Sequence, residues 1–127
     1  MSRISDSVVL ELPAISEYVS TIRLTASSVA SRLGFDIDQI EDIKVSVAEV
    51  CNLLLSRMKE DLLRYKITFE LHEGELTVIF EGIDVPLRCL CENVGEEYGL
   101  YIIRALMDTV ELCNDKSSIV ISKKIGV

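Results

Sequence analysis

The strongest constraint on the fold is a pair of neighbouring stretches, YKITFEL (65–71) and ELTVIFEG (75–82), in which apolar and polar residues alternate. Alternation of this kind is typical of a β-strand that buries one face. The residues that join them, HEG (72–74), include a glycine and are few enough for a tight turn. The two stretches therefore predict a β-hairpin, with His72 as an exposed turn residue.

Two helices are predicted before this hairpin. Apolar residues recur at helical spacing through 15–33, and Gly34 is a natural C-terminal stop for that helix. A second stretch with helical spacing covers 38–58. Asp38 is expected to be its N-cap, and Glu41, three residues later, to complete a capping box.

The remaining elements complete the predicted fold. Alternation in VVLELP (8–13) predicts a first strand. The helical spacing of YGLYIIRALMDTV (98–110) predicts a third helix, and the stretch 110–125 predicts a last hairpin. Strands paired at two places favour a mixed, mainly antiparallel sheet with helices on one face. The expected fold class is thus an α/β two-layer sandwich, formed by one domain of residues 1–127.

Charge and hydropathy exclude several classes of protein. The net charge is −8, with 21 acidic against 13 basic residues, which argues against direct binding of nucleic acid and is compatible with capture of a basic partner. There is no apolar run of membrane-spanning length, and the first residues lack the apolar core of a signal peptide. We therefore expect a cytoplasmic protein without a membrane partner.

The four cysteines do not form a recognisable metal or redox site. In the cytoplasm they are expected to be reduced thiols, and Cys51 and Cys113 lie in apolar surroundings typical of small core residues. Cys89 and Cys91 have the spacing C-x-C, which differs from the C-x-x-C of zinc and redox sites. With a single histidine elsewhere, the side chains predict no metal centre of this type.

One carboxylate stands in an otherwise apolar run, VSVAEVCNLLLSRM (45–58). Glu49 falls on a helix face offset from the core stripe, so it need not be buried in the core. Either it is an ordinary surface glutamate, or it lies in a half-apolar groove with Val45 and Leu53 and has a chemical role.

Two stretches of the sequence resemble a known protein family. YVSTIRLTASSVASRLGFDIDQIEDIKVSVAEVCN (18–52) is similar to the first half of bacterial anti-sigma-factor serine kinases, and GLYIIRALMDTVEL (99–112) resembles their C-terminal helix and following strand. These proteins belong to the GHKL superfamily. The resemblance implies the histidine-kinase-like ATPase (Bergerat) fold, with ATP and Mg²⁺ as cofactors if the family activity is retained.

The resemblance also implies roles for residues of the second long helix. Glu49 matches the family's general base, the catalytic residue. The family places a Mg²⁺-binding asparagine four residues later, but this chain has Leu53 there, and leucine offers no oxygen to a hard cation. Asn52 is one position early, about 100° round the helix, and could take the nucleotide-binding and metal roles only if the helix were locally rewound.

The family's adenine-binding motif, Asp-x-Gly, is altered in this chain. In FEGIDVP, Gly82 falls where the aspartate should be, and Asp84 where the glycine should be. Glu81 or Asp84 could substitute after a register shift. The other interpretation is a turn that leaves a strand.

The family's phosphate-binding motif, Gly-x-Gly-Leu, is altered as well. Gly99 matches its second glycine, whereas Glu97 replaces the first, and Glu96 adds a further negative charge beside a triphosphate. The lid before Gly99 is also short for the family. Together these changes predict weakened or lost ATP binding.

Two functions follow from the resemblance. The first is a regulator that binds a sigma factor or an anti-anti-sigma protein through Arg23, which matches the family's partner-binding arginine, and that forms a homodimer by sheet-edge or helix-face pairing. The alternative is an active ATP-dependent serine-protein kinase. A third interpretation is a pocket for another small ligand, made more apolar by Leu53, Ile83 and Val85, although plain core packing is the preferred explanation for these three residues.

Overall fold

A computed structural model describes residues 4–57, 62–83, 87, 98–112 and 117–126 of the 127-residue chain. The elements follow the predicted order of one strand, two helices, two strands, one helix and two strands, with a short 3₁₀ helix (η1) before the first α-helix. They are β1 (Ile4–Pro13), η1 (Ser16–Tyr18), α1 (Val19–Leu33), α2 (Ile37–Arg57), β2 (Arg64–His72), β3 (Glu75–Gly82), α3 (Tyr98–Leu106), β4 (Thr109–Glu111) and β5 (Ile119–Lys124). Among the described helices, none is long and apolar enough to cross a bilayer.

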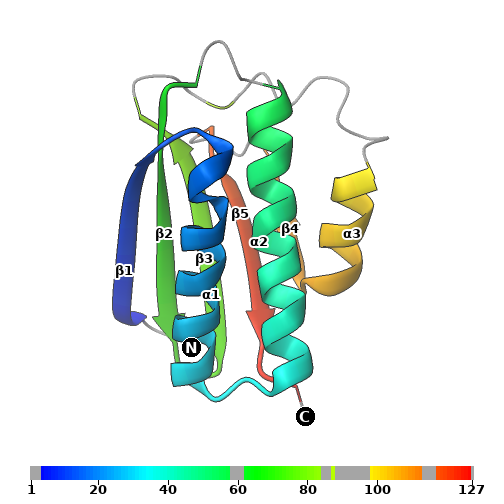
Figure 1. The fold of residues 1–127 in the computed structure, drawn as a ribbon. Coiled ribbons are helices and arrows are strands. Elements are labelled where there is room, and N and C mark those ends of the chain that lie inside the picture. Colours follow the sequence, from blue (N-terminus) through cyan, green and yellow to red (C-terminus); the bar gives the residue numbers. More distant parts are fainter. Residues whose placement is uncertain (1–3, 58–61, 84–86, 88–97, 113–116, 127) are drawn as a thin grey trace.

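The strands form one five-stranded sheet in the order β1-β2-β3-β5-β4, and every neighbouring pair is antiparallel. All three α-helices lie on the same face of this sheet, with α2 between α1 and α3 (Figure 1). The predicted two-layer sandwich is therefore confirmed. Strands β1 and β4 are the two edges, and β1 is longer than the predicted stretch 8–13.

The central hairpin has a tighter turn than the sequence suggested. Strand pairing continues to His72 and Glu75, so only Glu73 and Gly74 form the turn, and Gly74 has the positive φ of 76° that this turn requires. The prediction of His72 as an exposed turn residue is wrong. Its side chain is 13% exposed, and its Nε2 lies 3.3 Å from Oε1 of Glu70, two residues earlier on the same strand.

The hydrophobic core lies between the sheet and the helices. Buried and partly exposed residues alternate along β2 and β3, as the sequence pattern predicts for a sheet covered on one face. The helices close this core with fully buried apolar side chains. From α1 and α2 these include Ile22, Ala26, Ala30, Ile43, Val47, Val50, Cys51 and Leu54.

The connection between α1 and α2 confirms one prediction and corrects another. Gly34 ends α1 in the left-handed conformation, with φ of 95°, and its N–H bonds the carbonyls of Ala30 and Ser31. The capping box of α2 is not formed by Asp38 and Glu41. The Gln39 N–H donates to Asp36 Oδ1 at 2.8 Å, and the Asp36 N–H donates to Gln39 Oε1 at 3.4 Å. The chain thus satisfies its free N–H groups two residues earlier.

A set of polar contacts fixes the C-terminal end of α3 against α2 and β5. Lys123 Nζ donates to the carbonyl oxygen of Leu106, the last residue of α3, at 2.6 Å and lies 3.7 Å from Asp42 Oδ2 on α2. Asp108 Oδ2 accepts a hydrogen bond from the Lys124 N–H at 2.6 Å. A lysine is well suited to the last turn of a helix because its charge offsets the negative end of the dipole.

Candidate functional site

A cavity of about 190 Å³ lies between α2 and the N-terminal turn of α3. Four of its five lining residues come from one side of α2, because positions three, four and seven residues apart share a helix face. The fifth comes from α3. The lining residues are Glu49, Asn52, Leu53, Ser56 and Gly99.

Glu49 points into this cavity and away from the core. Its side chain is half-buried, and a Cβ built on Gly99 would lie only 2.8 Å from Glu49 Oε1. The carboxylate therefore lies against the backbone of the first turn of α3. Of the two positions that the sequence left open for Glu49, this is the one in a groove.

Asn52 and Leu53 both reach the same cavity. Asn52 is exposed, whereas Leu53 is only 5% exposed and forms an apolar part of the wall. The helix is α-helical without interruption from Ile37 to Arg57. Asn52 therefore lines the cavity from a regular helix, without the local rewinding that the family pattern suggested.

The other candidate residues lie elsewhere. Gly82 is the last residue of β3, pairs with Tyr65 and does not line the cavity, and Asp84 lies outside the described residues. Ser56 was not predicted to be a site residue, although its spacing of seven residues places it on the same helix face as Glu49. Its hydroxyl donates to the carbonyl oxygen of Leu53 at 3.2 Å. Within the described part of the chain, no cluster of three or more His, Cys, Asp or Glu side chains could hold a metal.

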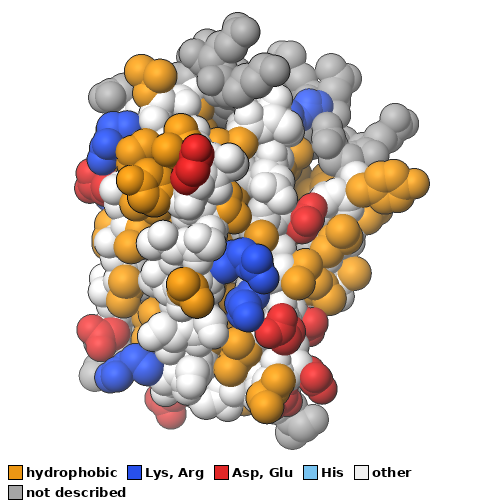
Figure 2. All heavy atoms as spheres, in the orientation of Figure 1, with side chains coloured by type: hydrophobic (Ala, Val, Ile, Leu, Met, Phe, Trp, Pro, Cys, Tyr) orange, Lys and Arg blue, Asp and Glu red, His pale blue; other side chains and the backbone are white. Residues whose placement is uncertain are grey.

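A second depression, of about 220 Å³, lies on the other side of α2, toward α1, and is lined by Ser20, Arg23, Leu24 and Lys44. Arg23 is exposed and forms no ion pair with any described residue, while Lys44 lies 3.1 Å from Oε1 of Glu41. Leu24 is 68% exposed. Figure 2 shows basic side chains gathered in the middle of the helical face, over the junction of α1 and α2. We call this surface the cationic depression.

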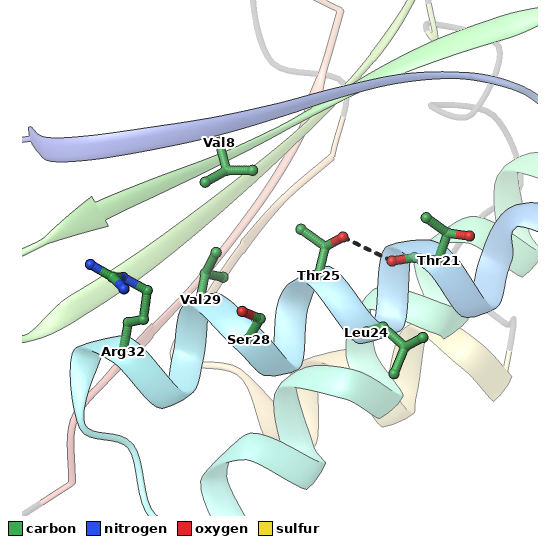
Figure 3. A pocket seen from close by; sticks show the side chains of 7 residues that line it. All are labelled: Val8, Thr21, Leu24, Thr25, Ser28, Val29 and Arg32. Carbon is green, nitrogen blue, oxygen red and sulfur yellow. Dashed lines mark hydrogen bonds between the residues drawn. The ribbon is translucent and has the colours of Figure 1, made fainter.

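A third, larger groove runs between the edge strand β1 and the outer face of α1. It encloses about 390 Å³, and most of its α1 residues are small or neutral. Figure 3 shows Val8 pointing from β1 toward α1, and the hydroxyl of Thr25 turned back to bond the Thr21 carbonyl oxygen at 2.9 Å. The lining residues are Val8, Thr21, Leu24, Thr25, Ser28, Val29 and Arg32.

Beneath these surfaces, the buried face of α2 carries a thiol in a dry environment. Burial raises the pKa of Cys51 from 9.0 to about 12, and the neighbouring Tyr65 hydroxyl lowers this pKa by a smaller amount. Burial also raises the pKa of Tyr65, with a further rise from the nearby Cys51. Both groups stay protonated at neutral pH, so Cys51 is the inert core residue that the sequence predicted. Cys89, Cys91 and Cys113 lie outside the described residues.

Comparison with known proteins identifies the family. The histidine kinase-like ATPase domain matches residues 12–123. The serine-protein kinases RsbW of Bacillus thuringiensis (strain Al Hakam) and Bacillus anthracis are each 33% identical over 135 residues, which cover 94% of this chain and 84% of the relative. Among solved structures, the RsbU and RsbW domains of Rv1364c from Mycobacterium tuberculosis share the fold, with a TM-score of 0.68 and 13% identity over 94% of this chain and 32% of that chain. The chain therefore belongs to the histidine kinase-like ATPase family and is a homologue of the RsbW serine-protein kinases.

Proposed function

We propose that this chain is a cytoplasmic, single-domain anti-sigma regulator that binds a sigma factor or an anti-anti-sigma protein, with weakened or lost binding of ATP. The observation that carries this proposal is the cationic depression. In a chain of net charge −8, Arg23 and Lys44 place two cations beside the exposed side chain of Leu24. Arginine and exposed apolar side chains are typical of the centre of a protein interface.

The availability of Arg23 supports the role that the family resemblance assigns to it. Its guanidinium forms no ion pair with a described residue, so a partner carboxylate need not displace an internal one. An arginine of this kind can bind a carboxylate with two parallel hydrogen bonds. The cationic depression therefore suits a partner that presents an acidic group next to an apolar one.

The composition of the α2–α3 cavity supports weakened nucleotide binding. Leu53 stands where the family has its magnesium ligand, and its buried side chain gives this part of the wall no oxygen atom. The described residues thus fit Mg²⁺–ATP poorly.

The test is to measure both interactions on the same protein by isothermal titration calorimetry. The chain is titrated with Mg²⁺–ATP and, separately, with purified sigma factors and anti-anti-sigma proteins from the same genome. We expect micromolar or tighter binding of one protein partner in the absence of nucleotide, and no heat from millimolar Mg²⁺–ATP. Failure of every such protein to bind would contradict the proposal.

One observation favours the second candidate, an active serine-protein kinase. Glu49 and Asn52 line the same cavity from a regular helix, so the chain offers a carboxylate general base and an amide oxygen for Mg²⁺ within one space. Micromolar binding of Mg²⁺–ATP, together with phosphate transfer to a serine of the anti-anti-sigma protein that Glu49→Gln abolishes, would establish this function instead.

We also propose that the chain forms a homodimer through the groove between β1 and α1. Strand β1 is a free edge of ten residues, and its Val8 and Val9 are 36% and 47% exposed. A long apolar edge strand is normally paired or covered. Sedimentation should show a dimer that Val8→Glu dissociates and that the control Ile37→Glu, at another exposed apolar residue, leaves intact.

A further inference from the structure

Gly99 and Glu49 are in close contact across the α2–α3 cavity. A Cβ built on Gly99 would lie 2.8 Å from Glu49 Oε1, but 3.8 Å from both Cβ and Cδ of Glu49. The last two distances are ordinary contacts, whereas the first is shorter than real Cβ atoms show. A methyl group at position 99 is therefore compatible with every part of the Glu49 side chain that lies near it except the carboxylate oxygen.

The backbone conformation does not explain the glycine. Among the described residues, the glycines with positive φ are Gly34 and Gly74, so Gly99 lies outside the region that disfavours a side chain. It is also the second residue of α3, where alanine favours the helix more than glycine does. The contact with Glu49 is therefore what a side chain at position 99 would disturb.

The helix itself is held in place, so the carboxylate is the part that would have to move. Leu100 and Ile103 of α3 are 2% and 0% exposed. The opposite end of α3 is fixed by the hydrogen bond from Lys123 to the Leu106 carbonyl oxygen. Rotation of a carboxylate in a partly open cavity requires much less rearrangement than withdrawal of this packed helix.

We propose that Gly99 is a positioning residue, whose missing side chain lets the Glu49 carboxylate turn into the first turn of α3. The significance of the contact rests on the proposed family role of this cavity, in which Glu49 matches the general base. The contact itself does not depend on whether nucleotide binds. It also accounts for the presence of Gly99 in a chain whose other motif glycine is replaced by Glu97.

The test is a double-mutant cycle on the full chain without nucleotide. Gly99→Ala is introduced into the wild type and into Glu49→Ala, and melting temperature is measured for all four proteins. We expect Gly99→Ala to raise the melting temperature in the Glu49→Ala background, where the helix gains alanine and no oxygen is displaced. In the wild-type background the effect should be lower by about 3 °C or more.

A spectroscopic readout separates positioning from a general effect on stability. The side-chain ¹³C resonance of Glu49, assigned by comparison with Glu49→Gln, should shift in Gly99→Ala. The matched control is Gly126→Ala, because a Cβ at Gly126 would also meet a side-chain tip at 2.8 Å, the Nε2 of Gln39. That variant should leave the Glu49 resonance unchanged.

The outcomes are distinct. Equal changes in melting temperature in both backgrounds, with an unmoved Glu49 resonance, overturn the proposal, and so does loss of folding on Gly99→Ala in both backgrounds. Loss of folding only where Glu49 is present supports it. Tight binding of Mg²⁺–ATP by the wild type would contradict the proposed loss of nucleotide binding and leave this inference unaffected.

Discussion

The buried side of α2 differs in chemistry from the cationic depression and the α2–α3 cavity that the same helix lines. The buried side of α2 is apolar except for Ser46, and its residues Val47, Val50, Cys51 and Leu54 are 0% exposed. Toward α1 and α3, the same helix lines a cationic depression and a carboxylate-bearing cavity. The difference shows that the buried side of one helix can maintain the family fold while the side chains on its outer sides differ from those of relatives. This is possible because few core contacts involve the outer residues.

The largest effect is expected on the inner side, at alkaline pH. The pKa of Cys51 is raised from 9.0 to about 12 in the folded chain, so between these values the unfolded chain loses the thiol proton and the folded chain keeps it. The free energy of unfolding should therefore fall as pH rises through this range, by about 1.4 kcal/mol per pH unit and about 4 kcal/mol in all. Below pH 9 this contribution is fully present.

Urea unfolding at pH 8 and pH 10.5 measures this effect. Wild type should lose about 2 kcal/mol more than Cys51→Ala between the two pH values, because the variant lacks the thiol. The difference between pH values is the relevant quantity, since Cys51→Ala also leaves a small cavity at every pH. Equal pH dependence in the two proteins would show that α2 does not bury a dry thiol.

The next effect concerns the outer side toward α1. Arg23→Glu replaces one of the two cations of the cationic depression with an anion and should weaken partner binding by about 30-fold or more, which corresponds to about 2 kcal/mol. The melting temperature should hardly change, because Arg23 is exposed and unpaired among the described residues. Calorimetric titration of the partner gives the affinity. Arg104→Glu, the same charge change at an exposed position on α3, is the control and should bind normally.

The sequence could predict the inner side well and the outer sides only in part. The alternation in 65–82 and the helical spacing in 15–33 both arise from burial. Every buried position in these stretches is apolar, so the pattern can be recognised in the sequence. The cavity depends on how α3 meets α2, and Glu49 and Gly99 are distant in the chain. Their contact has no periodic signal, and only the family resemblance pointed to both residues.

The hydrophobic pattern also could not predict which polar residue caps α2. Asp36 and Asp38 are both acceptable N-caps by residue type, and each is followed three residues later by a Gln or Glu. Only the geometry of the connection from Gly34 decides between them. Asn52 was predicted to point away from the metal position for a similar reason. Helical spacing gives the direction of a residue's Cα only, and the cavity is wide enough to be lined by both Asn52 and Leu53.

A smaller effect, on nucleotide affinity, is expected from substitution of Leu53, which belongs to both the buried side and an outer side of α2. Leu53 is both buried and part of the cavity wall. Leu53→Asn supplies an amide oxygen at the family's magnesium position and should tighten Mg²⁺–ATP binding by about tenfold, or about 1.4 kcal/mol. Leu53→Ala removes the apolar wall of the cavity without adding an oxygen and should produce no such gain. If both variants bind nucleotide equally, the missing ligand does not explain weak binding.

The smallest effect tests where α2 begins, and hence the register of both its sides. Asp36→Ala removes the side-chain acceptor of the Gln39 N–H and should lower the free energy of unfolding by about 1 kcal/mol. Asp38→Ala is a matched control, because Asp38 lies in the first turn of α2 and contributes only through the helix dipole, about 0.3 kcal/mol. Urea unfolding of the two variants ranks these effects. A larger loss for Asp38→Ala would place the start of α2 two residues later, with the capping box that the sequence first suggested.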